Sequence, residues 1–299
     1  MNSSFETWRI VNAAVGDLGM GEKYMLKLVF TDLDGTFVDS QKLVPERNAH
    51  VLDLAAERGV QFVPCTGRNA NGILPELANH PAVRYAICCN GALVVDLRED
   101  RVLRSAPMSN EQVLELYERV RNLRVSFDVF INGKVYLERS RWEIPHEASG
   151  GDRAAEKFFY SLRTPYDCSL EELLQRGPAT KVTMLHPGNI DAAAVRAAAE
   201  SVEGVEWTWS LPMNTEVANA EASKGAALAW LCRHLGVDVA DAVAFGDGDN
   251  DLSMIRAAGD GVAMANAIPE VLAAADHVTA SCDEAGVAAY LEPILSAMA

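Results

Sequence analysis

The chain has 299 residues, of which 49% are hydrophobic and 23% are charged, and its 42 acidic and 26 basic residues give a formal net charge of −16. This length favours two domains, and the composition is that of a globular protein able to bury a sizeable core. The acidic balance argues against nucleic acid as a partner, and no apolar run is long enough to span a membrane.

The cysteines and histidines predict neither disulfides nor a zinc site. The six cysteines contain no C-x-x-C pair, and the six histidines show no zinc-ligand spacing. We therefore expect buried free thiols in a reducing, cytoplasmic setting. Residues 1–24 lack the basic start and apolar core of a signal peptide, and we expect a loose tail or a product of start-codon choice there.

The first third of the chain alternates short apolar runs with a helical pattern. LKLVF (26–30), VQFVPC (60–65) and the run at 85–89 have the composition of buried strands. A helix is expected over 45–59, with a proline at its start and a glycine at its stop. Strands that alternate with helices predict parallel βαβ units, with helices on both faces of a sheet.

The middle of the chain follows a different pattern. A helix is expected after an N-cap at Ser109 or Asn110, and two β-rich runs joined by Asn132 and Gly133 predict a hairpin. The whole section has the order α-β-β-α-β-α-β. We interpret it as an inserted α/β domain, a cap, over residues 101–211.

The first pattern resumes near the C-terminal end. A helix is expected over 223–236, a strand over 241–247, and then a further helix and strand. Residues 25–100 and 212–299 would form one discontinuous sheet domain. The predicted fold class is α/β, a Rossmann-like doubly wound parallel sheet with an inserted α/β cap.

Polar side chains follow the predicted core strands, and ligands bind at such strand ends in open parallel sheets. TDLDGT follows the first strand, TGR the second and DGDND the strand at 241–247, while SKG opens the preceding helix. The polar members of these segments include Asp32, Asp34, Thr66, Arg68, Lys224, Asp247, Asp249, Asn250 and Asp251. Four segments far apart in sequence would therefore converge on one edge of the sheet.

Clustered carboxylates at this edge predict a hard cation. A Mg²⁺ ion between the TDLDGT turn and Asp247 would have oxygen ligands and would offset their mutual repulsion. Asp32 could then accept a phosphoryl group, while Lys224 neutralises charge and the Thr66 hydroxyl donates to the phosphate. Asp34 is placed to protonate the leaving oxygen and then to deprotonate water.

Each segment alone has a plainer interpretation, so the argument depends on their conjunction. A D-x-D-G turn can be a solvated turn, and Ser223 can be a helix N-cap beside an exposed Lys224. An EF-hand fails because Leu252 and Ala258 stand where its loop needs glycine and glutamate. A dinucleotide-binding oxidoreductase fails because no G-x-G-x-x-G follows the first strand.

In this order, TDLDGT, TGR, SKG and GDGDND resemble the four motifs of the haloacid dehalogenase superfamily of phosphatases. The long insert between TGR and SKG, preceded by NGA at 90–92, resembles the Cof-type branch with its α/β cap. The resemblance runs from Met25 to the C-terminus. It is specific over the motifs and only architectural over the cap.

The resemblance implies a role for each motif residue. Asp32 would be the nucleophile that forms an aspartyl-phosphate, Asp34 the general acid and base, and Lys224 the cation that holds phosphate and nucleophile. Asp249 matches no ligand of the family and is expected to be a solvated loop residue. The implied Mg²⁺ ligands and their support are Asp32, the Asp34 main-chain carbonyl, Asp247 and Asp251. The implied phosphate-binding residues are Thr66, Gly67, Arg68, Asn90 and Asn250.

Some of these assignments have equally good alternatives. Arg68 can be part of a surface ion pair, and Asn90 can be a turn residue. In the cap, Arg141, His146 and Arg163 could contact the leaving group of a substrate, although such residues are more often surface side chains.

These inferences predict a Mg²⁺-dependent phosphatase that hydrolyses a small phosphomonoester, either a sugar phosphate or a phosphorylated cofactor. Asp34 argues against the ATPase relatives, which carry threonine at that position. A phosphomutase with the same aspartates, or a non-catalytic module that binds Mg²⁺ and phosphate, stays open as an alternative. The expected partner is a small phosphorylated metabolite, with no nucleic acid and no membrane, and the expected assembly is a monomer or weak homodimer.

Overall fold

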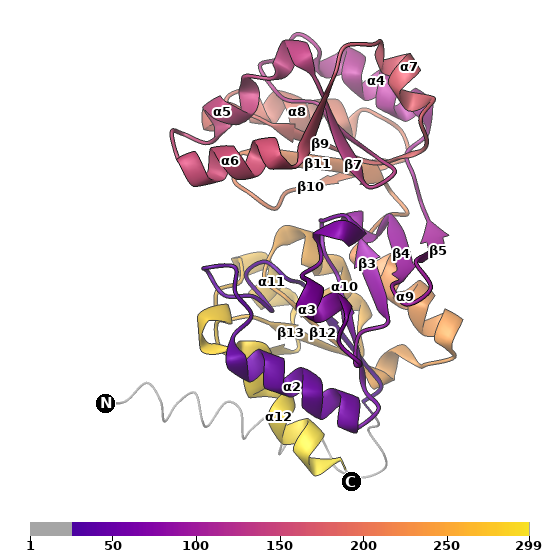
Figure 1. Cartoon of the computed structure of the whole chain (residues 1–299), viewed down its shortest axis with the longest axis vertical. Coiled ribbons are helices and arrows are strands. Elements are labelled where there is room, and N and C mark those ends of the chain that lie inside the picture. The colour runs from indigo at the N-terminus through magenta and orange to yellow at the C-terminus, as the bar shows by residue number, and fades with distance from the viewer. Residues whose placement is uncertain (1–25, 299) are drawn as a thin grey trace. The chain divides into compact units, whose positions relative to one another are not determined.

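The computed structural model describes residues 26–298 (Figure 1), and the predicted N-terminal tail lies outside them. The described chain divides into two compact units. Unit 1 contains the described residues up to Thr66, Ile73–Leu103, and the described residues from Ser223 onward. Unit 2 contains Gly67–Gly72 and Arg104–Ala222.

Unit 1 is built on a parallel sheet with the strand order β14-β13-β12-β1-β2. Its strands are β1 (Leu28–Thr31), β2 (Gln61–Pro64), β12 (Ala242–Gly246), β13 (Asp260–Ala263) and β14 (His277–Val278). β3 (Tyr85–Cys88) lies beside β2 through parallel bridges, and it belongs to a second sheet with β4 (Leu93–Asp96) and β5 (Arg101–Ser105). β1 pairs with β12 although they come from opposite ends of the chain.

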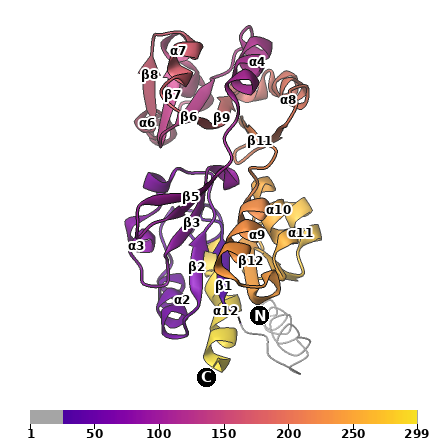
Figure 2. The same ribbon diagram turned by 90° about the vertical axis from the view of Figure 1, so that its right-hand side faces the viewer.

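Helices cover both faces of this sheet. Successive residues of a strand point to opposite sides, and strands that are apolar throughout need cover on both. The helices of unit 1 are α2 (Glu46–Glu57), α3 (Pro75–Ala78), α9 (Lys224–Leu235), α10 (Leu252–Ala257), α11 (Pro269–Ala274) and α12 (Gly286–Ala297). Phe30 and Ala244 pack on one face against α9 and α10. On the other face α2 and α12 pack together, and Phe245 contacts Tyr290 of α12 edge to face (Figures 1 and 2). This arrangement confirms the predicted doubly wound α/β core.

Local sequence sets the ends of the helices in unit 1. α2 begins after Pro45, and the chain leaves it through Gly59, whose φ is +71°. α9 begins after Ser223, whose hydroxyl accepts a 3.1 Å hydrogen bond from the amide of Ala226. It ends at Gly236, which adopts the left-handed conformation that glycine tolerates.

Unit 2 contains a six-stranded mixed sheet with the strand order β10-β11-β9-β6-β7-β8. Its strands are β6 (Asp128–Ile131), β7 (Lys134–Glu138), β8 (Arg163–Tyr166), β9 (Ala179–Leu185), β10 (Val205–Thr208) and β11 (Asn214–Asn219). Its helices are α4 (Asn110–Val120), α5 (Ile144–Ala148), α6 (Arg153–Ser161), α7 (Leu170–Leu174) and α8 (Ala192–Glu200). Val129 and Val182 of the sheet share an apolar core with α4, α7 and α8.

The sequence locates most of unit 2. Ser109 caps α4 in a capping box, and Asn132 and Gly133 take φ values of +49° and +73° at the predicted hairpin turn. The unit extends past the predicted boundary at 211, because β11 pairs with both β9 and β10. The sequence pattern also misses α5 and β8, since elements this short show no clear period.

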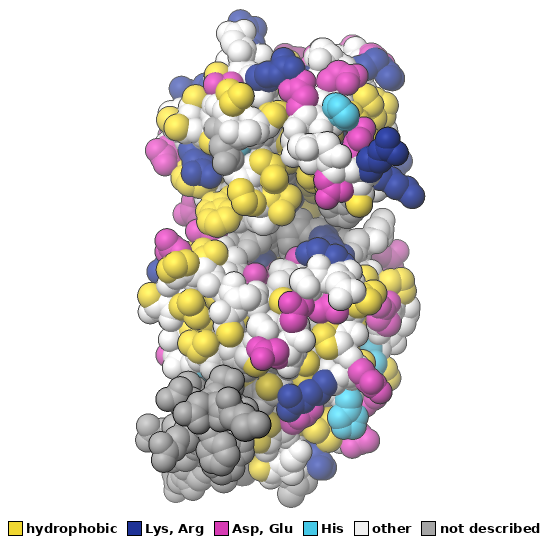
Figure 3. All heavy atoms as spheres, turned by 90° about the vertical axis from the view of Figure 1, so that its left-hand side faces the viewer, with side chains coloured by type: hydrophobic (Ala, Val, Ile, Leu, Met, Phe, Trp, Pro, Cys, Tyr) yellow, Lys and Arg dark blue, Asp and Glu magenta, His cyan; other side chains and the backbone are white. Residues whose placement is uncertain are grey.

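Two further expectations concern the cysteines and the surface. All six cysteines are free, as predicted, and all but Cys168 are buried. Within residues 26–298, no helix has both the length and the apolar character that crossing a membrane requires. On the face drawn in Figure 3, basic and acidic side chains are interspersed.

Candidate active site

The predicted motifs meet at the carboxyl ends of neighbouring strands in unit 1. Asp32 directly follows β1, Thr66 lies just beyond β2, and Asp247 follows β12. Because β1 lies between β2 and β12 in a parallel sheet, the three strand ends share one edge. Lys224 is the first residue of α9, which packs on this sheet.

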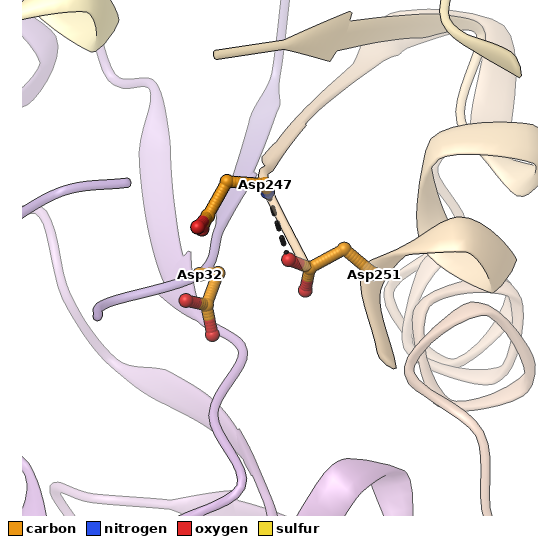
Figure 4. A group of neighbouring side chains, drawn as sticks. All are labelled: Asp32, Asp247 and Asp251. Atoms are coloured by element: carbon orange, nitrogen blue, oxygen red, sulfur yellow. Dashed lines mark hydrogen bonds between the residues drawn. The ribbon is translucent and has the colours of Figure 1, made fainter. Parts of the chain in front are cut away.

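Three carboxylates gather at this edge (Figure 4). Asp32, Asp247 and Asp251 each present an oxygen that lies within 4.8 Å of the other two. Asp32 is 7% exposed and Asp251 is fully buried, so solvent screens their repulsion only weakly. Among the described residues, no other group of three acidic, histidine or cysteine side chains has this spacing.

Lys224 supplies positive charge to this cluster. Its side chain is fully buried, and Nζ donates hydrogen bonds of 2.6 Å to Oδ1 of Asp32 and to Oδ1 of Asp251. Burial alone would lower the pKa of Lys224, but the two carboxylates outweigh it and raise the pKa, so the ammonium stays charged. One cation thus faces three carboxylates, and negative charge is in excess.

The excess charge is visible in the pKa values of the carboxylates. Burial raises the pKa of Asp32 well above its ordinary value, against the lowering effect of Lys224. Burial also raises the pKa of Asp247 to about 6, and the charge of Asp251 adds to the shift. Protonation relieves the repulsion, and a divalent cation would relieve it as well. Three hard oxygen donors in this spacing therefore fit Mg²⁺.

Asp251 holds the cluster together. Its Oδ1 accepts from Lys224, and its Oδ2 accepts from the amides of Asp247 and Gly248, each at 2.9 Å. The bond from the Asp247 amide is the dashed line of Figure 4. With both oxygens engaged, Asp251 is suited to supporting a metal site and orienting Lys224.

The TDLDGT turn approaches Asp247 so closely that only glycine fits at Gly35. Its φ is +87°, and a Cβ there would lie 2.5 Å from Oδ2 of Asp247. Thr36 donates a 2.7 Å hydrogen bond to Oδ1 of the same carboxylate. The turn therefore positions Asp247 from both sides.

Asp34 lies in a different environment from Asp32. Its side chain is 37% exposed, and Oδ1 lies 3.0 Å from Nζ of Lys42. It is not a member of the three-carboxylate group. The two aspartates of one motif thus differ in burial, which suits a nucleophile and a proton-exchanging residue.

Asn90 and Gly91 together connect three of the motifs. The main-chain amide of Asn90 donates to the carbonyl of Thr66 at 3.1 Å, and its side-chain Oδ1 accepts from Nδ2 of Asn250 at 3.1 Å. The neighbouring Gly91 packs against the start of α9, where a Cβ would lie 2.2 Å from the carbonyl oxygen of Ser223. The structure therefore brings Thr66, Asn90 and Asn250 together.

Gly67 and Arg68 group with unit 2, whereas the other motif residues lie in unit 1. Nη1 of Arg68 donates to the carbonyl of Gly72 at 3.0 Å, within the same short segment. The predicted core segment 25–100 is thus interrupted at this point. Asp249 is half-buried in the short turn before α10 and is outside the carboxylate group.

The three residues singled out in the predicted cap all have partners within unit 2. Arg141 donates to the carbonyl of Val125, between α4 and β6, at 2.6 Å. Arg163 pairs with the buried Asp128, and His146 lies 3.0 Å from a carboxylate of α6. Arg141 and Arg163 therefore stabilise unit 2 itself.

Sequence reasoning missed two residues that support the site. One is Thr36, and its position inside the TDLDGT motif is a sequence signal that could have identified its hydroxyl as a donor to a nearby carboxylate. Ser253 accepts from the amide of Gly225 at 3.0 Å and fixes the first turn of α9 against α10. No sequence signal marks Ser253, because its role depends on two helices meeting.

Comparison with known proteins gives consistent matches over nearly the whole chain. Residues 29–291 match the family of haloacid dehalogenase-like hydrolases. The chain is 31% identical over 277 residues to the putative phosphatase YxeH of Bacillus subtilis strain 168, with 91% of this chain and 100% of YxeH covered. It is 29% identical to the pyridoxal phosphate phosphatase YbhA of Escherichia coli K12, with 84% and 92% covered. The solved structure of BT1666 from Bacteroides thetaiotaomicron, a phosphatase of the same superfamily, matches with a TM-score of 0.79 at 25% identity, covering 93% of this chain and 98% of that one.

Proposed function

Because the chain belongs to the haloacid dehalogenase-like hydrolases, we propose that it is a Mg²⁺-dependent phosphatase that works through an aspartyl-phosphate on Asp32. Family membership confirms the predicted superfamily and the predicted enzyme class, a phosphatase. The observation that carries the mechanistic proposal is the buried Lys224, bonded at 2.6 Å to Asp32 and to Asp251.

In the first step, an ionised carboxylate oxygen of Asp32 forms a bond to phosphorus while the bond from phosphorus to the leaving oxygen breaks. Lys224 keeps its charge and offsets negative charge on the transferring oxygens. Asp32, Asp247 and the Asp34 carbonyl would hold Mg²⁺, with Asp251 in support. The bound ion would keep Asp32 ionised against the effect of burial and would neutralise phosphoryl oxygens.

Asp34 is proposed as the acid and base of the two steps. It gives a proton to the leaving oxygen in the first step. In the second step it takes a proton from the water that attacks phosphorus and releases Asp32. Its half-exposed side chain can exchange protons with solvent between the steps, which the buried Asp32 cannot do readily.

The proposed substrate is a small phosphomonoester, a sugar phosphate or a phosphorylated cofactor. The name of the relative YbhA, a pyridoxal phosphate phosphatase, supports a cofactor as one member of this class. Thr66, Asn90 and Asn250 are the proposed phosphate-binding residues, because hydrogen bonds join them beside the carboxylate cluster. Unit 2 is proposed to be the cap that selects the substrate.

Phosphate release from a panel of phosphorylated metabolites and p-nitrophenyl phosphate, with Mg²⁺ or with EDTA, tests this function. We expect multiple turnover with Mg²⁺ and none with EDTA. Asp32→Asn should abolish phosphate release while the protein still unfolds in a cooperative thermal transition. Asp249→Asn, in the same acidic region, should keep most of the phosphatase activity. Turnover by Asp32→Asn would refute the mechanism, and isomerisation without phosphate release would identify a mutase.

A further inference from the structure

We propose that Lys42 is a positioning residue that holds the carboxyl group of Asp34 in the orientation for proton transfer. Nζ of Lys42 lies 3.0 Å from Oδ1 of Asp34, although Lys42 belongs to no recognised motif. The inference rests on the proposed function, because Lys42 has this task only if Asp34 is the acid and base.

Lys42 is presented by a closed turn. The amide of Asp39 donates to the carbonyl of Leu43 at 2.9 Å, and the amide of Lys42 donates to the carbonyl of Asp39 at 3.0 Å. Oδ1 of Asp39 accepts from the amides of Gln41 and Leu43, each at 2.9 Å. Four hydrogen bonds thus fix the backbone from which the lysine side chain extends.

The same turn is tied to the TDLDGT segment and to the C-terminal region. Asp34 forms a parallel bridge with the buried Val38, directly before the turn. The amide of Ser40 donates to Oδ1 of Asp283 at 2.8 Å. Asp34 and Lys42 are therefore carried by one anchored stretch of backbone, so their separation does not depend on a mobile loop.

Stability alone does not explain a lysine at this position. Lys42 has a φ of +66°, the left-handed conformation that costs energy for any residue with a Cβ. Its side chain is 61% exposed, and exposed ion pairs contribute little to stability. Glycine or asparagine would suit the turn better. The charged side chain beside Asp34 is what a lysine adds.

The contact restrains the carboxyl group of Asp34 through one of its oxygens. The ammonium of Lys42 lies 3.0 Å from Oδ1 and attracts it as an ion pair, so rotation of the carboxyl group is restricted. In the proposed reaction the proton passes from Asp34 to the leaving oxygen as the bond to phosphorus breaks, and Asp34 later takes a proton from the attacking water.

This role predicts an effect that depends on the leaving group. A sugar alkoxide is a poor leaving group and needs the proton, whereas p-nitrophenolate leaves without one. Loss of Lys42 should thus impair hydrolysis of an alkyl phosphate more than hydrolysis of p-nitrophenyl phosphate. A lysine that merely stabilised the fold would affect both substrates equally.

The test measures kcat/KM in the presence of Mg²⁺ for two substrates, p-nitrophenyl phosphate and a sugar phosphate that the wild type hydrolyses. The variants compared with the wild type are Lys42→Met, Lys42→Arg and the control Lys27→Met. Lys27 is a matched control, because it forms a 2.7 Å ion pair with Asp241 in the same unit, away from the motif residues. Lys42→Met should lose about tenfold or more with the sugar phosphate and little with the aryl substrate. Lys42→Arg should keep most activity, because arginine keeps the positive charge beside Asp34. All variants should have the melting temperature of the wild type.

Equal losses on both substrates, no loss, or a gain with the sugar phosphate would overturn the positioning role. A selective loss in Lys27→Met would overturn it as well. Failure of the proposed function has a different signature, since the wild type would then release no phosphate from any substrate or Asp32→Asn would stay active. That result would remove the role of Lys42 together with the mechanism.

Discussion

Replacing Lys224 with methionine should destabilise metal-free protein strongly, and more at neutral than at acidic pH. The Lys224 side chain is fully buried and donates two 2.6 Å hydrogen bonds, to Asp32 and to Asp251. Methionine occupies a similar volume but leaves these carboxylates, and Asp247 beside them, without a cation. Removing one partner of a buried ion pair costs about 3–5 kcal/mol of unfolding free energy.

Protonation limits this loss. The pKa of Asp32 and that of Asp247 are already raised by burial, and loss of Lys224 removes an effect that lowers both. The folded variant therefore binds more protons than its unfolded chain, so its stability rises as the pH falls through the raised folded pKa values. Neutralising a carboxylate costs about 1.4 kcal/mol for each pH unit above its pKa. We expect a loss of about 3 kcal/mol near neutral pH and a clearly smaller one about two units lower.

Urea unfolding of the two proteins in EDTA, at neutral and at acidic pH, measures this difference in midpoint. Lys27→Met is the matched control, because its ion pair with Asp241 is partly exposed to solvent and is worth about 1 kcal/mol. Mg²⁺ should restore part of the stability of Lys224→Met by neutralising the same carboxylates, while phosphatase activity stays lost. A Lys224→Met protein as stable as Lys27→Met, or one more strongly destabilised in acid, would refute the argument.

Three further predictions follow from single contacts. Gly35→Ala should weaken Mg²⁺ activation about tenfold or more, because the alanine Cβ would lie 2.5 Å from Oδ2 of Asp247. An unchanged dependence of activity on Mg²⁺ concentration would contradict this. Mg²⁺ should raise the melting temperature at neutral pH, and this rise should vanish as the pH falls below about 6, the pKa of Asp247, because protons then compete with the cation. A rise that does not depend on pH would exclude Asp247 as a Mg²⁺ ligand. Burial opposes ionisation of Asp96, but Arg84 and two backbone amides outweigh it and lower the pKa of Asp96. The ionised Asp96 thus stabilises the fold above its unfolded pKa, and this stabilisation is lost as the pH falls through the folded pKa. Asp96→Asn should therefore lower the free energy of unfolding at neutral pH and lower it less in acid, which urea midpoints would measure.

Local sequence determined the elements that carry the motifs. α9 starts after Ser223 and ends at Gly236 as predicted, because an N-cap hydroxyl and a left-handed glycine act within a few residues. β1 and β12 were recognisable because strands buried on both faces are continuous apolar runs. A carboxylate directly after such a strand could therefore be assigned to the ligand-binding edge, and Asp32 and Asp247 were found in this way.

Only the tertiary structure decided which of these side chains meet. Lys224 contacts Asp32 and Asp251 across 192 and 27 residues of chain, and no local rule specifies such contacts. The contact between Lys42 and Asp34 was likewise invisible, because it depends on the path of a turn. The raised pKa of Asp247 arises from burial and a neighbouring charge, and both are properties of packing rather than of residue type. The sequence thus determined which chemical groups were available, and long-range packing determined their distances and charge states.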